Sequence, residues 1–210
     1  MLLYDRFLPD GARDGVPVLV LLHGRGSHRG DLQALRPSLP PGWALVTPQA
    51  PHPGEPWGYG PGWAWYRYIA ADTVDEATLA QGMAELDAFL DGLPALLGVT
   101  PGRLVIGGFS QGGTMSLAWA LRNPGRADVL NFSGFLIDSP TVPRTGAAVK
   151  QARVFWGHGF RDPAIPFALA QKGRAALAAA GATLDAHDYE IGHWITPEEV
   201  ADAVRFLGPG

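Results

Sequence analysis

The sequence of 210 residues predicts an α/β fold: a mainly parallel sheet with helices on both faces, in a single domain that covers residues 1–210. Continuous aliphatic runs, such as residues 16–22 and 104–106, are typical of strands buried on both faces of a parallel sheet. These runs alternate with stretches such as 73–97, in which apolar residues recur at helical spacing. Hydrophobic residues make up 47% of the chain and charged residues 17%, which indicates a globular protein.

Composition also argues against several classes of function. The 16 basic residues form no basic block and the net charge is -4, so a nucleic-acid partner is not expected. The absence of cysteine excludes disulfides, cysteine-ligated zinc and a thiol nucleophile. No segment approaches the roughly eighteen apolar residues of a membrane span, and residues 1–6 do not resemble a signal peptide. We therefore expect a cytoplasmic protein, and the sequence leaves open whether it forms a homodimer.

The elements are expected in alternating order. Strands are predicted at residues 2–8 (an edge strand), 16–22, 43–48, 104–106, 129–136, 152–156 and 183–191. Helices are predicted at residues 31–39, 73–97, 114–121, 167–180 and 196–206. Two of these helices begin with a capping-box pattern, in which an N-terminal threonine and a glutamate three residues later satisfy each other's backbone N–H groups: Thr73 with Glu76, and Thr196 with Glu199.

Residues 51–68 differ in character from the rest of the chain, because prolines and glycines alternate with tryptophans and tyrosines. So many aromatic side chains predict an ordered loop rather than a solvated linker. Two interpretations stay open: the loop packs against the edge of the sheet, or it forms an aromatic wall of a substrate pocket.

The motif G-F-S-Q-G at residues 108–112 lies between a predicted strand and a predicted helix. In that context G-x-S-x-G forms a nucleophile elbow, whose small residues let strand and helix pass closely while the serine adopts a strained conformation. The turn would expose the Ser110 hydroxyl and direct the Gln111 N–H toward a developing negative charge. A glycine-rich turn that contains a serine by chance is the alternative.

Two further strand ends carry polar residues that complement a nucleophilic serine. Asp162 follows the strand at 152–156, and His193 follows the strand at 183–191. A histidine can remove the serine proton and return it to the leaving group, while a carboxylate fixes the histidine tautomer. The order Ser110, Asp162, His193 is that of α/β-hydrolases. Asp138 is the alternative acid, but Asp162 lies in a tighter turn.

The turn H-G-R-G at residues 23–26 follows an early strand, so the Arg25 N–H is the candidate for a second oxyanion donor. A simple glycine turn is the alternative. His23 and His158 lie inside turns and are expected to orient the backbone through hydrogen bonds. The six histidines show no ligand spacing, so we expect no metal site and no cofactor.

Four segments together resemble the phospholipase/carboxylesterase family of α/β-hydrolases, which includes the acyl-protein thioesterases. They are L-H-G-R-G at 22–26, G-F-S-Q-G-G at 108–113, H-G with Asp162 and Pro166 at 158–166, and G-H at 192–193. The resemblance implies an α/β-hydrolase fold without a cap domain, with Ser110 as nucleophile, Asp162 as orienting acid and His193 as base. It also implies that the backbone N–H groups of Arg25 and Gln111 bind the oxyanion.

Three aromatic residues are candidates for the substrate pocket. Trp65 and Tyr66 resemble a Trp-Phe or Trp-Tyr element of the family, in a loop that borders the acyl site. Trp194 directly follows the predicted base.

The sequence departs from the family at Arg25, where eukaryotic thioesterases have an apolar residue, and at Ser27 and His28, where an acidic residue is common. The Arg25 side chain either points to solvent or favours esters with an acidic or polar group near the scissile bond.

The expected function is that of a serine carboxylesterase that acts on small to medium acyl esters through an acyl-enzyme, with a small-molecule ester as its partner. An acyl-thioesterase or a lysophospholipase with the same triad is the alternative. A non-catalytic hydrolase-like binding protein is a further alternative from a different class.

Overall fold

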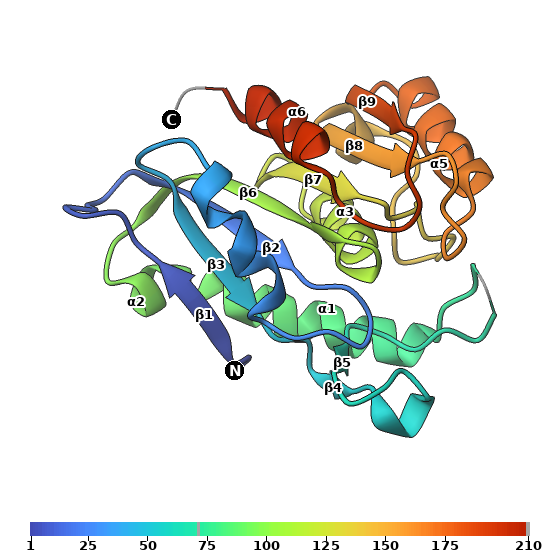
Figure 1. Cartoon of the computed structure of the whole chain (residues 1–210), viewed down its shortest axis with the longest axis horizontal. Helices are drawn as coiled ribbons and strands as arrows, with labels where there is room; N and C mark the ends of the chain where they lie inside the picture. The colour runs from blue at the N-terminus through green and yellow to red at the C-terminus, as the bar shows by residue number, and fades with distance from the viewer. Residues whose placement is uncertain (71, 209–210) are drawn as a thin grey trace.

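A computed structural model describes residues 1–70 and 72–208 of the chain (Figure 1). Its main sheet has seven strands in the order β1-β3-β2-β6-β7-β8-β9, and only β1 runs antiparallel to its neighbour. These strands are β1 (Tyr4–Phe7), β2 (Val16–Leu22), β3 (Ala44–Pro48), β6 (Pro101–Phe109), β7 (Asp128–Phe132), β8 (Arg153–Gly159) and β9 (Thr183–Tyr189). The predicted α/β fold with a mainly parallel sheet is confirmed.

Helices cover both faces of the sheet. They are η1 (Asp31–Ser38), η2 (Glu55–Trp57), α1 (Glu76–Asp91), α2 (Leu93–Leu97), α3 (Gln111–Arg122), α4 (Ala147–Lys150), α5 (Phe167–Ala179) and α6 (Pro197–Leu207). Figure 1 shows η1 and α6 in front of the sheet, and α1 and α3 behind it. Strand β2 explains this arrangement, because its side chains alternate between two buried faces. Val18 and Val20 pack with the apolar residues of α1, α3 and α5, whereas Leu19 and Leu21 pack with those of η1 and α6.

The helix predicted for residues 73–97 is divided in two and begins later than its capping box suggests. Asp75, not Thr73, is the N-cap of α1, and its carboxylate accepts a hydrogen bond from the Thr78 N–H at 3.0 Å. Thr73 is used in the preceding turn, where its carbonyl accepts from the Ile69 N–H at 2.8 Å. The Glu76 carboxylate accepts a hydrogen bond from Ser139 and therefore does not return to the N-terminus of the helix, as the capping box predicts. Gly92 separates α1 from α2.

The capping box at the start of α6 forms only half as predicted. Thr196 Oγ1 accepts a hydrogen bond from the Glu199 N–H at 3.2 Å. The Glu199 carboxylate does not return to the cap: it is fully buried against Gly157 of β8, and neither oxygen has a partner among the described residues. Burial raises the pKa of Glu199 to about 8, which favours the protonated, neutral carboxyl group at pH 7.

The aromatic segment 51–68 forms the short strands β4 (His52–Pro53) and β5 (Trp63–Ala64), which pair with each other. It lies against the turn that follows β2, because the Gly26 N–H donates to the Trp63 carbonyl and the Trp63 N–H donates to the Ser27 carbonyl, both at 2.8 Å. A Cβ on Gly62 would lie 2.1 Å from the Gly26 carbonyl oxygen, so only glycine permits this approach. The segment therefore packs beside the strand ends.

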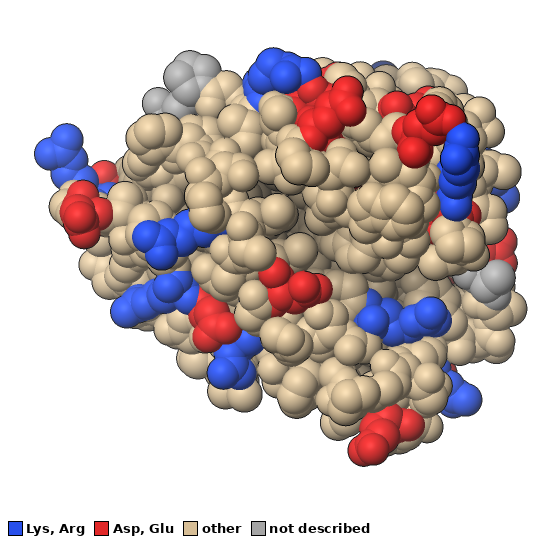
Figure 2. Space-filling model, viewed as in Figure 1, with Lys and Arg blue, Asp and Glu red and all other residues tan. Residues whose placement is uncertain are grey.

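No helix within the described ranges is long and apolar enough to span a membrane. On the face shown in Figure 2, acidic and basic side chains are interspersed. That face thus presents no basic patch of the kind that binds polyanions.

Candidate active site

Ser110 stands alone between the end of β6 and the start of α3. Its φ of 56° and ψ of -117° are strained for a residue with a side chain. A Cβ at Gly108 would lie 2.3 Å from the Leu22 carbonyl oxygen, and one at Gly112 would lie 1.9 Å from the same atom. The two glycines therefore allow β2, β6 and α3 to meet, and the Ser110 hydroxyl emerges at the carboxyl edge of the sheet.

His193 and Asp162 reach Ser110 from the loops after β9 and β8. His193 Nε2 lies 2.8 Å from Ser110 Oγ, and His193 Nδ1 lies 2.6 Å from Asp162 Oδ2. The ring of Phe109 packs against the imidazole with 4.7 Å between ring centroids. Because parallel strands end at one edge, three residues separated by up to 83 positions form one hydrogen-bonded series.

The backbone of its own turn holds the carboxylate of Asp162 in place, in addition to the contact with His193. Its Oδ1 accepts hydrogen bonds from the N–H groups of Ala164 and Ile165, both at 2.8 Å, and its side chain is fully buried. The His158 Nε2–H donates to the Ile165 carbonyl at 2.9 Å and closes the same turn. Burial lowers the pKa of His158, which favours the neutral ring. This ring stabilises the backbone of the turn through its hydrogen bond to Ile165.

The alternative acid, Asp138, lies apart from this series. Its side chain is 77% exposed and pairs with Arg144 at 2.7 Å. It forms no hydrogen bond with His193, whose two ring nitrogens already face Ser110 and Asp162.

Two backbone N–H groups beside Ser110 find no acceptor within the described parts of the chain. One belongs to Gln111, whose N–H is left over at the start of α3, and the other belongs to Arg25. A Cβ on Gly24 would lie 3.6 Å from Ser110 Cβ, so the turn that carries Arg25 runs directly past the serine.

His23 holds this turn in place. Its Nδ1–H donates to the Gly24 carbonyl at 2.8 Å, and its Nε2 accepts from the Ala50 N–H at 3.0 Å. Burial lowers the pKa of His23 to about 4, so the ring is neutral and can serve as donor and acceptor at once.

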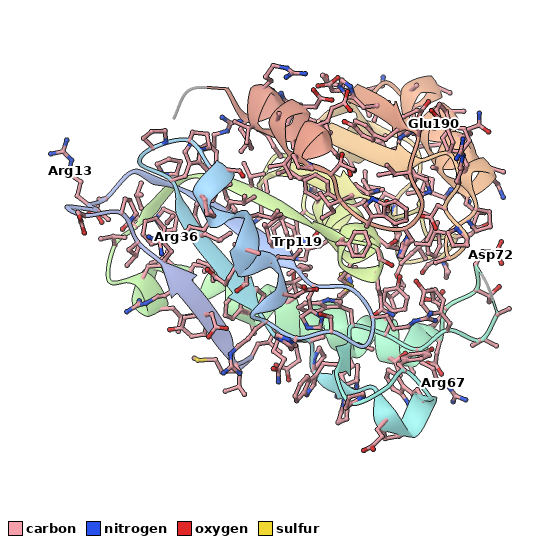
Figure 3. All side chains as sticks on the ribbon, viewed as in Figure 1. Arg13, Arg36, Arg67, Asp72, Trp119 and Glu190 are labelled. Atoms are coloured by element: carbon pink, nitrogen blue, oxygen red, sulfur yellow. The ribbon has the colours of Figure 1, made fainter. Side chains whose placement is uncertain are left out.

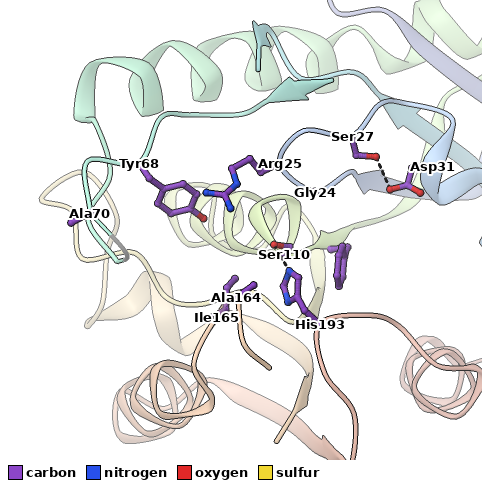
Figure 4. A pocket seen from close by; sticks show the side chains of 11 residues that line it. Gly24, Arg25, Ser27, Asp31, Tyr68, Ala70, Ser110, Ala164, Ile165 and His193 are labelled. Carbon is purple, nitrogen blue, oxygen red and sulfur yellow. Dashed lines mark hydrogen bonds between the residues drawn. The ribbon is translucent and has the colours of Figure 1, made fainter. Parts of the chain in front are cut away.

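A cavity of about 390 Å³ opens over Ser110 (Figure 4). Its lining consists of Gly24, Arg25, Ser27, Asp31, Tyr68, Ala70, Phe109, Ser110, Ala164, Ile165 and His193. In Figure 4, Arg25 and Tyr68 lie together on one side of the cavity, while Ser27 and Asp31 lie on the other. Tyr68 belongs to the segment 51–68, for which a pocket wall was one of the two open interpretations, whereas the sequence did not predict Asp31, Ala70, Ala164 and Ile165. The last two could have been found from their position in the turn after Asp162, but nothing in the sequence pattern marks Asp31.

None of the three predicted pocket aromatics lines this cavity. Trp65 and Tyr66 are fully buried behind its wall, and the Trp65 Nε1–H donates to the His23 carbonyl at 3.0 Å. Tyr66 Oη lies 3.2 Å from the hydroxyl of Tyr68, which does face the cavity. Trp194 is 55% exposed, and its ring packs over the backbone of Gly192.

Among residues 1–70 and 72–208, no group of three or more His, Asp or Glu side chains gathers where it could hold a metal ion.

A family model for phospholipases and carboxylesterases matches residues 9–208. The chain belongs to the phospholipase/carboxylesterase family. It is similar to the acyl-protein thioesterase 1 of Mycosarcoma maydis, with 30% identity over 214 residues that cover 90% of this chain and 89% of the relative. Its match to the acyl-protein thioesterase 1 of Gibberella zeae is 33% identical over 115 residues, which span 52% of this chain and only 49% of that protein.

The family's fold is found again in a solved structure, that of esterase PE8. It superimposes with a TM-score of 0.80 over 98% of this chain and 97% of its own, at 27% identity. Membership of the family identifies the chain as a carboxylic ester hydrolase with an α/β-hydrolase fold.

Proposed function

We propose that this chain is a serine carboxylesterase that hydrolyses small to medium acyl esters. The observation that carries the proposal is the hydrogen-bonded series from Ser110 through His193 to Asp162, at 2.8 and 2.6 Å, on the floor of a cavity. The strained elbow and the two free N–H groups beside it support the same chemistry.

In the first step, Ser110 Oγ attacks the ester carbonyl while His193 Nε2 takes the hydroxyl proton. The carbonyl oxygen becomes an oxyanion and accepts hydrogen bonds from the N–H groups of Arg25 and Gln111. The tetrahedral intermediate then expels the alcohol, which receives the proton from His193. The acyl group stays on Ser110, and Asp162 stabilises the imidazolium that forms between these events.

In the second step, a water molecule replaces the alcohol. His193 Nε2 takes one of its protons as its oxygen attacks the acyl carbonyl, and the same two N–H groups bind the new oxyanion. Collapse of this intermediate releases the carboxylic acid and returns the proton to Ser110.

The size of the cavity supports the choice of substrate. A volume of about 390 Å³ lies at the lower end of the range of about 300–1,000 Å³ that is typical of small-molecule sites. An acyl group of a few carbons fits such a space together with its leaving group, whereas a long lipid tail would extend beyond it.

A thioesterase is the second candidate, because curated relatives of this chain are named acyl-protein thioesterases. The same serine, base and oxyanion donors can attack a thioester carbonyl. A lysophospholipase would require room for a long acyl chain. A non-catalytic binding protein fits less well, since such a protein has no use for a serine within 2.8 Å of an oriented imidazole.

The test is hydrolysis of 4-nitrophenyl acetate, butyrate, octanoate and palmitate by the wild type and by Ser110→Ala. We expect a maximum at a short or medium chain and loss of turnover in the variant. A parallel series of thioesters with the same acyl groups ranks the two candidates. Equal turnover in Ser110→Ala would contradict the proposal, and an inactive but folded wild type would favour a binding protein.

A further inference from the structure

The side chain of Arg25 lines the catalytic cavity and remains exposed to solvent at its edge. Its guanidinium carbon is 4.7 Å from the ring centroid of Tyr59 and 5.3 Å from that of Tyr68. Figure 4 shows the guanidinium directed toward Tyr68, above the floor formed by Ser110 and Ala164. Two aromatic faces thus fix the orientation of the cation and leave its N–H edge for another group.

Among residues 1–70 and 72–208, the positive charge of Arg25 is paired with no carboxylate. No carboxylate within the described ranges lies within 4.0 Å of its guanidinium, whereas Arg29 and Arg144 pair with carboxylates at 3.0 and 2.7 Å. Tyr68 does not neutralise the charge, because burial raises the pKa of its hydroxyl above the ordinary value of 10.0.

The other charge in the cavity is Asp31, on the opposite side. Its carboxylate accepts a hydrogen bond from Ser27 Oγ at 2.7 Å and faces the same space. The cavity therefore has a positive end and a negative end, with the serine between them (Figure 4). An anionic group on a bound molecule is attracted to Arg25 and repelled by Asp31, so only one orientation satisfies both charges.

We propose that Arg25 binds a carboxylate carried by the substrate, so that the preferred substrates are esters with a free carboxylate a few bonds from the scissile carbonyl. This inference rests on the proposed function and names its substrate class. Half-esters of dicarboxylic acids are the simplest members: hydrolysis converts the half-ester and water into the dicarboxylate, the alcohol and one proton. The planar guanidinium can donate two parallel hydrogen bonds to a carboxylate.

The geometry of the turn explains how the Arg25 side chain can select a substrate carboxylate without obstructing the attack of Ser110 on the ester. The turn that carries its backbone N–H passes beside Ser110, while its side chain extends toward Tyr68. When the carbonyl oxygen of a substrate accepts a hydrogen bond from the Arg25 N–H, a carboxylate a few bonds away can reach the guanidinium of Arg25. The spacing between the two groups of the substrate is thereby set by one side chain.

The experiment compares charged and neutral substrates of the same shape. Monoethyl succinate, glutarate and adipate are each paired with the ethyl ester of the corresponding monoamide, and release of acid is followed at constant pH. Alkyl esters are used because aryl half-esters are cleaved by their own carboxylate. We expect kcat/KM of the wild type to favour the anion by about tenfold for the best chain length.

Variants then locate the source of that preference. The ratio of kcat/KM for the anion to that for the amide should fall about tenfold in Arg25→Gln and less in Arg25→Lys, which keeps the charge but not the planar fork. Arg67→Gln is the matched control, since it removes the same charge from an exposed side chain that does not line the cavity (Figure 3). We expect the ratio to stay unchanged in this control.

Binding without turnover separates this inference from the proposed function. Calorimetry of monoethyl glutarate with Ser110→Ala should give a Kd about tenfold lower than with the double variant Ser110→Ala, Arg25→Gln. If Arg25→Gln does not fold, the wild type itself provides the test, because 0.5 M salt should reduce its preference for the anion.

An equal ratio in wild type and Arg25→Gln, or a preference that does not respond to salt, would overturn the role of Arg25 and leave the esterase intact. Activity that survives in Ser110→Ala would overturn the proposed function instead.

Discussion

The side-chain carbonyl of Gln111 accepts a hydrogen bond from the backbone N–H of Trp65 at 2.8 Å. The other end of the same amide donates to the carbonyl of Tyr66, also at 2.8 Å. Gln111 is fully buried, so one side chain joins the nucleophile elbow to the aromatic segment and satisfies two backbone groups that water cannot reach. The residue that we propose as an oxyanion donor thus also positions the wall behind Tyr68.

Gln111→Ala should destabilise the protein, because it leaves the Trp65 N–H and the Tyr66 carbonyl buried without partners. We expect the free energy of unfolding to fall by about 2–6 kcal/mol, since each of the two orphaned groups costs about 1–3 kcal/mol. Urea unfolding measures the change. Gln33→Ala is the control, because Gln33 makes a single, less buried hydrogen bond to Thr47 at 2.8 Å. Equal midpoints for Gln111→Ala and Gln33→Ala would contradict the bracing role.

Asp162→Asn should abolish most activity with little change in the fold. The amide would retain an oxygen for the N–H groups of Ala164 and Ile165, but its NH₂ group would face His193 Nδ1 and favour the wrong tautomer. We expect kcat to fall by about 10³–10⁴-fold. Asp138→Asn provides the comparison, because its exposed carboxylate pairs only with Arg144, and its kcat should stay within about twofold of the wild type. A larger loss in Asp138→Asn than in Asp162→Asn would reverse the assignment.

Gly112→Ala should lower the thermal stability of the protein far more than Gly98→Ala. The new Cβ at Gly112 would lie 1.9 Å from the Leu22 carbonyl oxygen, which forces α3 away from β2 and moves Ser110. Gly98 ends α2 with a φ of 74° and has no atom within 4 Å of a new Cβ, so alanine there costs only about 1–2 kcal/mol of backbone strain. Thermal unfolding of both variants checks this order, and similar melting temperatures would speak against the close contact.

The buried carboxyl group of Glu199 should make the stability of the protein fall as pH rises. Its pKa is about 8 in the folded protein, above its ordinary value of 4.5, so between these values the folded chain holds a proton that the unfolded chain releases. The free energy of unfolding should therefore decline from about pH 4.5 to pH 8 by at most about 5 kcal/mol, and no further above pH 8.

Glu199→Gln should remove this decline, because glutamine is neutral throughout. Urea unfolding at pH 5, 6, 7 and 8 measures the slopes, and comparing slopes cancels any constant effect of the amide. Glu198→Gln, on the exposed side of the same turn, should keep the slope of the wild type. Parallel profiles for Glu199→Gln and the wild type would show that the buried group is charged.

The parts of the site that depend on local pattern could be predicted from the sequence. Ser110 directly follows β6, and Asp162 and His193 lie in the loops just after β8 and β9. The ends of parallel strands meet at one edge regardless of their separation in the chain. The turn at residues 23–26 could be placed for the same reason. Their catalytic roles stay a proposal, as do the cytoplasmic location and a homodimer.

The parts that depend on packing between distant segments could not be predicted. The sequence does not show that Trp65 and Tyr66 lie behind the cavity wall, because their burial results from hydrogen bonds to Gln111, 46 and 45 positions away. The pattern T-x-x-E correctly predicted that the Thr196 side chain caps the helix. Its prediction that the Glu199 carboxylate returns to the cap was wrong, because this group is buried against Gly157. A motif specifies backbone geometry more reliably than the direction of a long side chain.

The most direct test of the central claim is to trap the acyl-enzyme. The wild type and Ser110→Ala are quenched in acid during turnover of 4-nitrophenyl butyrate, digested and mapped by mass spectrometry. We predict a butyryl group on the peptide that contains Ser110 and none on any peptide of the variant. An acyl group on another residue, or turnover in the variant with no adduct at all, would contradict the account.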